Sequence, residues 1–306
     1  MAAYVGRRLL AAVPTLFLII TISFFLVRVA PGGPFDLERP LEASILANLR
    51  RVYQIDRPLY EQYLSYLWNL FHGDLGPSFY WRDFSVAELL GKALPISMRL
   101  GATALVLAVV VGGALGAVGA LRQNKSADYA VMTAATLGVT IPNFVVAPIL
   151  QLVFGLGFAW LPVGGWNDGA WRNTILPIVT LALPQLAVVA RLTRASMIEV
   201  LRSHHVRTLR ANGLPMRVIL RHALRGAALP VVSYLGPAAA ALLTGSIVVE
   251  NIFGIPGMGR YFVDGALNRD YTLVMGTVIL VAVLVILLNM AVDLAYALLD
   301  PRVRYD

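Results

Sequence analysis

The stretch LGATALVLAVVVGGALGAVGAL, residues 100–121, contains 22 consecutive uncharged residues. A membrane-spanning helix needs about 20 mostly apolar residues, because the hydrocarbon core of a bilayer is about 30 Å thick. The composition of the whole chain agrees with this stretch. The chain has 306 residues, of which 58% are apolar and 14% charged, whereas a soluble domain carries about 25% charged residues. The sequence therefore predicts an all-α integral membrane protein.

Five further apolar runs have a similar length, so we expect six transmembrane helices. The predicted spans are residues 9–27, 100–121, 129–154, 174–190, 226–249 and 273–292. The first run is longer than the apolar core of a signal peptide and has no clear cleavage site, which favours a retained helix over a cleaved signal. The third run is followed by GLGFAWLPVGGW, residues 155–166, whose Gly, Pro and Trp content is typical of an interfacial loop.

Basic residues between the spans predict the orientation of the chain. Segment 191–225 holds eight arginines against one acid, Glu199. The other basic residues on this side are Arg7, Arg8, Arg122, Lys125, Arg302 and Arg304. The opposite side carries Arg172, Arg260 and Arg269 together with Glu250, Asp264 and Asp270. We therefore expect both termini and segment 191–225 to be cytoplasmic. The net charge of +8 follows from this topology and does not indicate nucleic acid binding.

Residues 31–95 form an outer insert with six basic and eight acidic residues. Its first expected helix carries Leu41, Ile45, Leu46, Leu49, Val52 and Tyr53 at helical spacing. In the second, Asp56 is the expected cap, Pro58 lies in the first turn and Gly73 ends the helix. Its apolar stripe consists of Tyr60, Tyr63, Leu64, Leu67 and Phe71. This stripe would pack on the membrane domain or contact a substrate or partner. Residues 85–88, SVAE, predict a capping box that starts a short helix before the second span.

The spans carry few ionisable groups, which argues against an ion-coupled carrier. Asp293 lies near the cytoplasmic end of the sixth span, and Arg28 and Arg99 lie near outer ends, where they could reach the interface. The neutral residues Asn143 and Asn289 are the candidates for a substrate path. The sequence contains no Walker A motif, no Gly-x-Ser-x-Gly motif and no cysteine, and its four histidines lack metal-ligand spacing. Energy for driven transport would therefore come from another subunit.

The sequence RTLRANGLPMRVILRHALRGAALP, residues 207–230, holds five arginines and no acid. Arg217, Arg221 and Arg225 would share one helix face, with Val218, Ile219, Leu220 and Leu224 around the other side. Gly213 and Pro215 predict a sharp bend between two helical pieces. Such a segment could dock into a groove of a cytoplasmic partner or lie on the anionic inner leaflet. A plain cationic loop would explain the charge but not the bend or the apolar surface.

Several motifs together resemble the permease subunits of bacterial ABC importers of the peptide/nickel group, in particular the B-type subunits of oligopeptide permeases. They are PTLFLIITISFF (14–25), LVRVAPGGPF (26–35), GDLGPSF (73–79), IPNFVVAP (141–148), RASMIEVL (194–201), RANGLPMRVILRHALRGAALP (210–230), IFGIPGMGRYFVDGALNRDY (252–271) and DPRVRY (300–305). The resemblance covers almost the whole chain. It implies one transmembrane permease domain, residues 1–306, with the type I ABC importer fold, in a bacterial inner membrane.

The resemblance also implies a coupling loop, residues 194–226, that docks on an ATPase. In the family this loop carries Glu-Ala-Ala, three residues and then Gly. Gly213 takes the glycine place here, whereas Arg207, Thr208 and Leu209 stand where the family has Glu-Ala-Ala. The other coupling candidates are Leu214, Pro215, Met216, Val218 and Ile219. Apolar anchoring would transmit force, because exposed ion pairs contribute only about 0–1 kcal/mol.

The implied partners are a second, homologous permease subunit, two ABC ATPases, an extracytoplasmic peptide-binding protein and membrane lipid. ATP and Mg would bind the ATPases and not this chain. The hairpin with Phe253, Pro256, Gly257 and Gly259 would dip back and form part of an outer gate, or else be an ordinary surface turn. The expected function is peptide import by alternating access. Dipeptides, glutathione or nickel complexes remain alternative cargoes, and an ion-coupled carrier or a scaffold without transport remain alternative functions.

Overall fold

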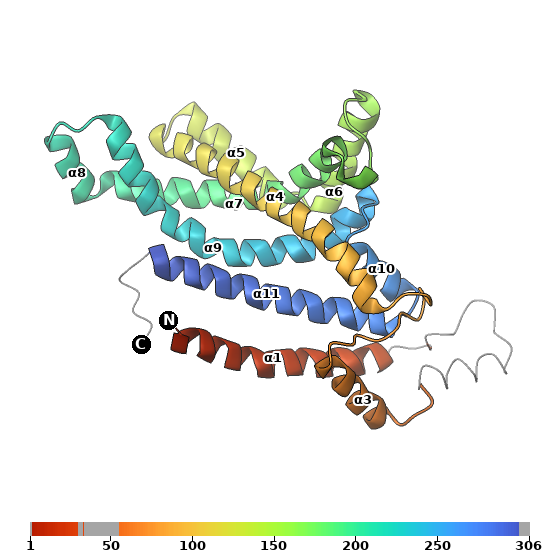
Figure 1. The fold of residues 1–306 in the computed structure, drawn as a ribbon. Coiled ribbons are helices and arrows are strands. Elements are labelled where there is room, and N and C mark those ends of the chain that lie inside the picture. Colours follow the sequence, from red (N-terminus) through yellow and green to blue (C-terminus); the bar gives the residue numbers. More distant parts are fainter. Residues whose placement is uncertain (1, 30–32, 34–54, 300–306) are drawn as a thin grey trace.

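The computed structural model describes residues 2–29, 33 and 55–299, and this part of the chain is helical, with no strand beyond one isolated bridge between Pro77 and Ser85. Figure 1 shows long helices running side by side. The elements are α1 Ala2–Val29, α3 Leu59–Phe71, α4 Val86–Leu121, α5 Ser126–Thr140, α6 Asn143–Leu150, η1 Gln151–Gly157, η2 Asn167–Gly169, α7 Trp171–Arg202, α8 His204–Ala211, α9 Met216–Phe253, α10 Met258–Leu267 and α11 Tyr271–Leu299. The predicted all-α class is confirmed.

Five described helices are long and apolar enough to cross a membrane. The spanning segments are Gly6–Val29, Val86–Leu121, Trp171–Arg202, Met216–Leu243 and Tyr271–Leu294. The third predicted span differs, because Ser126–Thr140 and Asn143–Gly157 are bent by 106° relative to each other. The break follows from Pro142, which lacks an N–H and favours an extended conformation at Ile141, whose ψ is 120°. The described residues hold up to six candidate spans if this bent pair counts as one.

The capping box at Ser85 is confirmed, but the helix that it starts is not short. The Ser85 hydroxyl accepts a hydrogen bond from the Glu88 backbone N–H at 3.2 Å, and the Glu88 carboxylate accepts one from the Ser85 N–H at 2.9 Å. The prediction of a separate short helix is wrong, because α4 continues through Pro95 for 36 residues. At 1.5 Å per residue it is about 54 Å long, so it extends beyond the hydrocarbon core.

The described part of the outer insert contains α3. The prediction that Asp56 caps this helix is wrong: the cap position is Pro58, with no side-chain cap bond. The Pro58 carbonyl instead accepts hydrogen bonds from the N–H groups of Glu61 and Gln62. Gly73 has a φ of +78° directly after the last turn, as expected for a helix stop. The first predicted helix of the insert, over residues 41–53, lies outside the described residues.

The bundle core depends on small residues that let α4 and α7 approach closely. A Cβ atom at Gly112 would lie 2.6 Å from the carbonyl oxygen of Leu186, and one at Gly116 would overlap the carbonyl oxygen of Ala190. Such contacts between backbones are typical of membrane helix pairs. Leu100 and Ala104 of α4 pack with Leu181 of α7 and with residues of α9 in the largest buried cluster.

The two ends of the bundle differ in composition. In Figure 1 the first turns of α1, the last turns of α11 and the whole of α8 lie at one end, whereas α3 and α10 lie at the other. Arg8 of α1 and Asp293 of α11 form an ion pair at the first of these ends, with a distance of 2.6 Å. The fold therefore separates the cationic segment from the described part of the outer insert.

Candidate functional site

The segment between α7 and α9, residues 203–215, is called the coupling segment below. Ser203 ends α7 and caps α8, where its hydroxyl accepts a hydrogen bond from the Val206 N–H at 3.4 Å. Val206 is fully buried, although the rest of α8 is mostly exposed. The segment is shorter than the predicted loop 194–226, since residues 194–202 belong to α7 and 216–226 to α9. Figure 1 shows α8 at the extremity of the bundle.

The bend between α8 and α9 has the predicted form. Gly213 has a φ of +70°, a conformation that residues with a Cβ atom resist. Its N–H donates to the Arg210 carbonyl at 3.0 Å, and the Leu214 N–H donates to the Leu209 carbonyl at 3.2 Å. Pro215 then takes the cap position of α9. A Cβ atom at Gly213 would meet nothing within 4 Å, so only the backbone conformation requires glycine.

The predicted coupling residues divide into exposed and packed groups. Leu214 is 37% exposed and Met216 is 50% exposed, so both could insert into a partner. Ile219, by contrast, is only 3% exposed and packs within this chain. The remaining exposed candidates are Arg207, Thr208, Gly213 and Pro215, and Leu209 and Val218 are half-buried. Arg217, Arg221 and Arg225 are also exposed on α9, as their shared helix face predicts.

The base of the coupling segment is a small-residue cluster that joins three helices. Ala120 of α4, Met197 of α7, and Ala223 and Ala227 of α9 are buried together, with Leu220 packed against them. The cluster therefore links α7 and α9, the helices on either side of α8, to α4.

A buried ion pair links α5 to α7, one of the three helices of the small-residue cluster. The Arg194 guanidinium donates to both carboxylate oxygens of Asp128, from Nε to Oδ1 at 2.5 Å and from Nη2 to Oδ2 at 2.7 Å. The Asp128 side chain is 2% exposed and also accepts the Asn124 N–H at 2.9 Å. Sequence analysis missed this pair, because 66 residues separate its partners and no local pattern links them.

The hairpin between α9 and α10 is buried, so the surface-turn alternative is wrong. Phe253 is 1% exposed, Ile255 is fully buried and Met258 is 2% exposed. Gly254 ends α9 with a φ of +64°. The Phe253 carbonyl accepts a hydrogen bond at 2.7 Å from Gly165 in the loop that follows η1, which fixes that loop to the hairpin. Pro256, one of the gate candidates, is half-buried within it.

Glu250 is central to this hairpin, although the sequence suggested a loop charge. The residue is fully buried in α9. Its Oε2 accepts the Gly259 N–H at 2.7 Å, and Ser97 of α4 accepts the Met258 N–H at 2.9 Å. Both side chains thus cap the start of α10. Oε1 of Glu250 has no hydrogen-bond partner in the described part of the chain.

Two of the hairpin glycines are required because a larger side chain would not fit there. A Cβ atom at Gly257 would overlap the carboxyl group of Glu250 and would lie 2.6 Å from the Ser97 hydroxyl. A Cβ atom at Gly259 would overlap the Cα atom of Ile247. The PGMG motif therefore permits close packing against α9 and α4, which the sequence pattern alone did not explain.

The two candidate path residues lie in different surroundings. Asn143 begins α6 directly after the break at Pro142, and its Oδ1 is buried without a hydrogen-bond partner among the described residues. Asn289 of α11 lies against α9, with its Oδ1 2.6 Å from where a Cβ atom of Gly236 would be. It also lines a cavity of about 180 Å³ between α1 and α11. The structure does not bring the two together.

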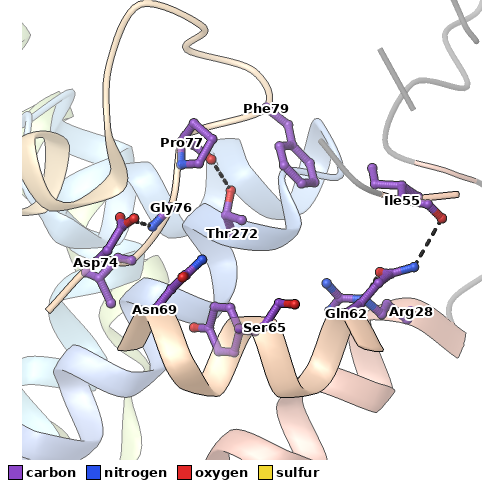
Figure 2. A pocket seen from close by; sticks show the side chains of 12 residues that line it. Arg28, Ile55, Gln62, Ser65, Asn69, Asp74, Gly76, Pro77, Phe79 and Thr272 are labelled. Carbon is purple, nitrogen blue, oxygen red and sulfur yellow. Dashed lines mark hydrogen bonds between the residues drawn. The ribbon is translucent and has the colours of Figure 1, made fainter. Parts of the chain in front are cut away.

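An outer cavity of about 170 Å³ lies beside α3 (Figure 2). Its lining residues are Arg28, Ile55, Gln62, Ser65, Tyr66, Asn69, Asp74, Leu75, Gly76, Pro77, Phe79 and Thr272. Arg28 donates to Gln62 at 3.2 Å and stacks on Phe24, with its Cζ 3.5 Å from the ring centroid. Arg99 donates to the Gly169 carbonyl of η2 at 3.1 Å.

Asp270, another acid that the sequence placed in a surface loop, binds residues that border the outer cavity. Asp270 is fully buried at the start of α11. Its Oδ2 accepts hydrogen bonds from the Ser78 hydroxyl and from the N–H groups of Phe79 and Tyr80, and its Oδ1 accepts the Leu273 N–H at 3.0 Å. Asp270 therefore joins the loop after α3 to α11.

Comparison with known proteins gives matches over nearly the whole chain. Residues 108–305 match the family described as binding-protein-dependent transport system inner membrane component, and residues 1–93 match the N-terminal part of such membrane components. The oligopeptide transport system permease protein OppB of Escherichia coli K12 is 53% identical over 306 residues, which is all of both chains. OppB of Haemophilus influenzae is 51% identical, again over all of both chains. The dipeptide transport system permease protein DppB of Bacillus subtilis is 43% identical over 99% of this chain and 98% of its own.

Proposed function

The chain belongs to the family of binding-protein-dependent transport system inner membrane components, and from this we propose that it is a permease subunit of an ATP-driven oligopeptide importer. As a permease component it is a transport subunit and not an enzyme. ATP and Mg would bind two partner ATPases. A second, homologous permease subunit would complete the translocation path, and an extracytoplasmic binding protein would deliver the peptide.

The coupling segment is the observation that supports this function most directly. Leu214 of this segment and Met216, the first residue of α9, expose their side chains at a bend that Gly213 makes possible. The surrounding arginines would orient the segment on an ATPase, while these two apolar side chains would carry the load. The small-residue cluster and the Asp128–Arg194 pair would then pass the movement to α4, α5, α7 and α9.

At the outer end, the Glu250 hairpin would act as one wall of the gate. Its buried contacts with Ser97 and Gly165 join α4, α9, α10 and the loop after η1 into one block. A block of this kind would move as a unit when the ATPases close. The break before Asn143 would place non-helical backbone at membrane depth, which is tolerated where it is buried in protein or lines a cavity. We assign Asn143 to the substrate path ahead of Asn289, whose amide packs between helices.

The orientation that we propose follows the distribution of basic residues. The coupling segment, the start of α1 and the end of α11 would face the cytoplasm of a bacterial cell, across its inner membrane. The end with α3 and α10 would face the binding protein. A cysteine replacing Met216 should accordingly cross-link to an ATPase inside the cell. Cross-linking of this cysteine to an extracytoplasmic protein would reverse the topology.

Uptake by the complete importer in proteoliposomes tests the function. We expect accumulation of a labelled oligopeptide to require ATP on the coupling-segment side and the binding protein on the other. A sodium or proton gradient without ATP should not support uptake, and such support would favour an ion-coupled carrier. Unlabelled oligopeptides should compete well. Because DppB relatives are also similar, dipeptides are the second candidate cargo, and stronger competition by dipeptides than by longer peptides would select it. Glutathione and nickel complexes serve as the remaining competitors.

A further inference from the structure

Helix α3 has three distinct faces, although it is only 13 residues long. Tyr63, Tyr66, Leu67 and Leu70 face the bundle and pack with Ile20 and Phe24 of α1 and with Met275 and Ile279 of α11. Gln62, Ser65 and Asn69 form a polar face. The third face is an apolar stripe, defined by Tyr60, Leu64, Trp68 and Phe71. The predicted stripe is thus divided: Tyr63 and Leu67 pack on the membrane domain, while the others do not.

The packed face fixes the level of α3 along the transmembrane bundle. The Tyr63 hydroxyl lies 2.6 Å from the hydroxyl of Thr21, and their hydrogen bond is the closest polar link between α3 and α1. Thr21 precedes Val29, the last residue of α1, by eight positions, which is about 12 Å along a helix. Helix α3 therefore lies beside the outer part of a membrane-spanning helix and not beyond its end.

The polar face points toward the outer cavity. Gln62, Ser65 and Asn69 all line it, and Figure 2 shows Asn69 near Asp74 and Gly76 and Gln62 near Arg28 and Ile55. On this face the Gln62 amide donates to the Ile55 carbonyl at 3.1 Å. This side of α3 is suited to water.

Among the residues that the structure describes, none covers the apolar stripe. Tyr60 is 64% exposed, Leu64 61%, Trp68 67% and Phe71 86%. Their spacing of i, i+4, i+8 and i+11 places them on one side of the helix. The only charged residue in α3 is Glu61. Large contiguous apolar patches are rare on surfaces that face water, and they mark a membrane or partner contact.

The neighbouring surface of the protein indicates which of these contacts applies. Helix α1, on which α3 packs, itself exposes large apolar side chains in its outer half, among them Ile22 at 53%, Leu26 at 66% and Val29 at 80%. Trp and Tyr are the residues that concentrate where a bilayer meets water. A 13-residue helix is too short to span, but its polar face and apolar stripe suit a helix that lies in the plane of the interface.

We propose that α3 is an interfacial helix, with Tyr60, Leu64, Trp68 and Phe71 seated in the outer leaflet of the membrane and with its polar face turned to the outer cavity. The occupant of the stripe is lipid. By holding Tyr63 against Thr21 at a fixed depth, the seated helix sets the position of the outer end of α1 relative to α11.

Neighbouring positions on α3 provide a matched test. The chain has no cysteine, so Trp68→Cys and Asn69→Cys can each carry a single spin label in the complete importer, with cysteines of other subunits replaced. The importer is reconstituted in vesicles of phosphatidylethanolamine and phosphatidylglycerol. We expect the label at position 68 to collide more with dissolved oxygen, which concentrates in lipid, than with a water-soluble nickel chelate. The label at position 69 should show the reverse order.

Either of two results would overturn the proposal. Stronger collision of the label at position 68 with nickel than with oxygen would place the stripe in water. Shielding from both reagents would mean that a protein, either the second permease or the binding protein, covers it. If Trp68→Cys does not assemble, Leu64→Cys provides the same comparison from the same stripe. The readout does not depend on the cargo, so failed peptide uptake and a misplaced α3 are distinguishable.

Discussion

Arg194 of α7 holds both carboxylate oxygens of Asp128 at the start of α5, across 66 positions of sequence. Gly119 of α4 leaves room for the pair, since a Cβ atom there would be 3.2 Å from Asp128 Oδ1. Along the chain, α6, η1, a loop and η2 lie between α5 and α7. The contact therefore ties α5 directly to α7.

Breaking this ion pair should lower the stability of the helix bundle. Arg194→Ala leaves a carboxylate that is 2% exposed without its partner, which should cost about 1–3 kcal/mol of unfolding free energy. Replacing both residues, Asp128→Leu with Arg194→Met, should recover part of that loss, because no unpaired charge then remains. Thermal melting of the purified importer measures both. Equal melting temperatures for wild type and Arg194→Ala would show that the pair contributes nothing.

The bend at Gly213 should depend on backbone conformation alone. Gly213→Val forces a β-branched residue to a φ of +70°, at a cost of roughly 1–2 kcal/mol, and should uncouple ATP hydrolysis from peptide uptake. Gly213→Asn is the matched control, because Asn adopts the left-handed region more readily and no neighbour lies within 4 Å. The ratio of peptide transported to ATP hydrolysed is the measurement. Normal coupling in Gly213→Val would contradict the role of the bend.

Gly259 should tolerate no side chain. A methyl group there overlaps the Cα atom of Ile247, which is backbone and cannot rotate away, so Gly259→Ala should lose about 1–3 kcal/mol or fail to assemble. Gly91→Ala, at a position where a Cβ atom meets nothing within 4 Å, should be neutral or slightly stabilising. The yield and melting temperature of the importer report the difference. Equal behaviour of the two variants would mean that the hairpin is not packed as described.

Glu250 should be needed as a hydrogen-bond acceptor and not as a charge. No ion pair to Glu250 occurs among residues 55–299, and its Oε2 accepts the Gly259 N–H at 2.7 Å. Glu250→Gln keeps an acceptor oxygen and should retain most uptake. Glu250→Leu removes it, leaves the Gly259 N–H unpaired and should cost about 1–3 kcal/mol. Peptide uptake and the melting temperature of both variants show whether the acceptor or the charge is required. A loss in Glu250→Gln as large as that in Glu250→Leu would show that the charge itself matters.

Two tyrosines on α3 should respond differently to removal of their hydroxyl groups. Tyr63→Phe loses the hydrogen bond to Thr21 and should destabilise the protein by about 0.5–1.5 kcal/mol. The Tyr66 hydroxyl is buried without a hydrogen-bond partner among the described residues, so Tyr66→Phe should be neutral or stabilising. Melting of the two variants at neutral pH makes the comparison. Greater destabilisation by Tyr66→Phe would contradict the packing at α3.

Tyr66 should also make the stability of the protein depend on pH. Burial raises the pKa of Tyr66 to about 12, whereas an unfolded tyrosine ionises near pH 10. Between these values the unfolded chain releases a proton that the folded chain retains, so stability falls as pH rises. Tyr66→Phe should reduce this alkaline loss of stability.

The sequence alone determined the class of fold, the approximate spans and the bend at Gly213. These features follow from local chemistry: apolar length, the conformational freedom of glycine and the missing N–H of proline act within a few residues of their own position. The break at Pro142 had a local signal of the same kind, but the apolar run through it concealed the change of direction.

The tertiary structure decided which polar residues are buried and what they bind. Glu250, Asp270 and Asp128 look alike in sequence, as single acids at the ends of apolar runs. Their roles depend on Gly259, Ser78 and Arg194, which are brought to them by packing between helices. The division of α3 into a packed face and an exposed apolar stripe likewise required α1 and α11 to be in place. Periodicity can find an apolar stripe, but only the assembled bundle determines which side of it meets protein.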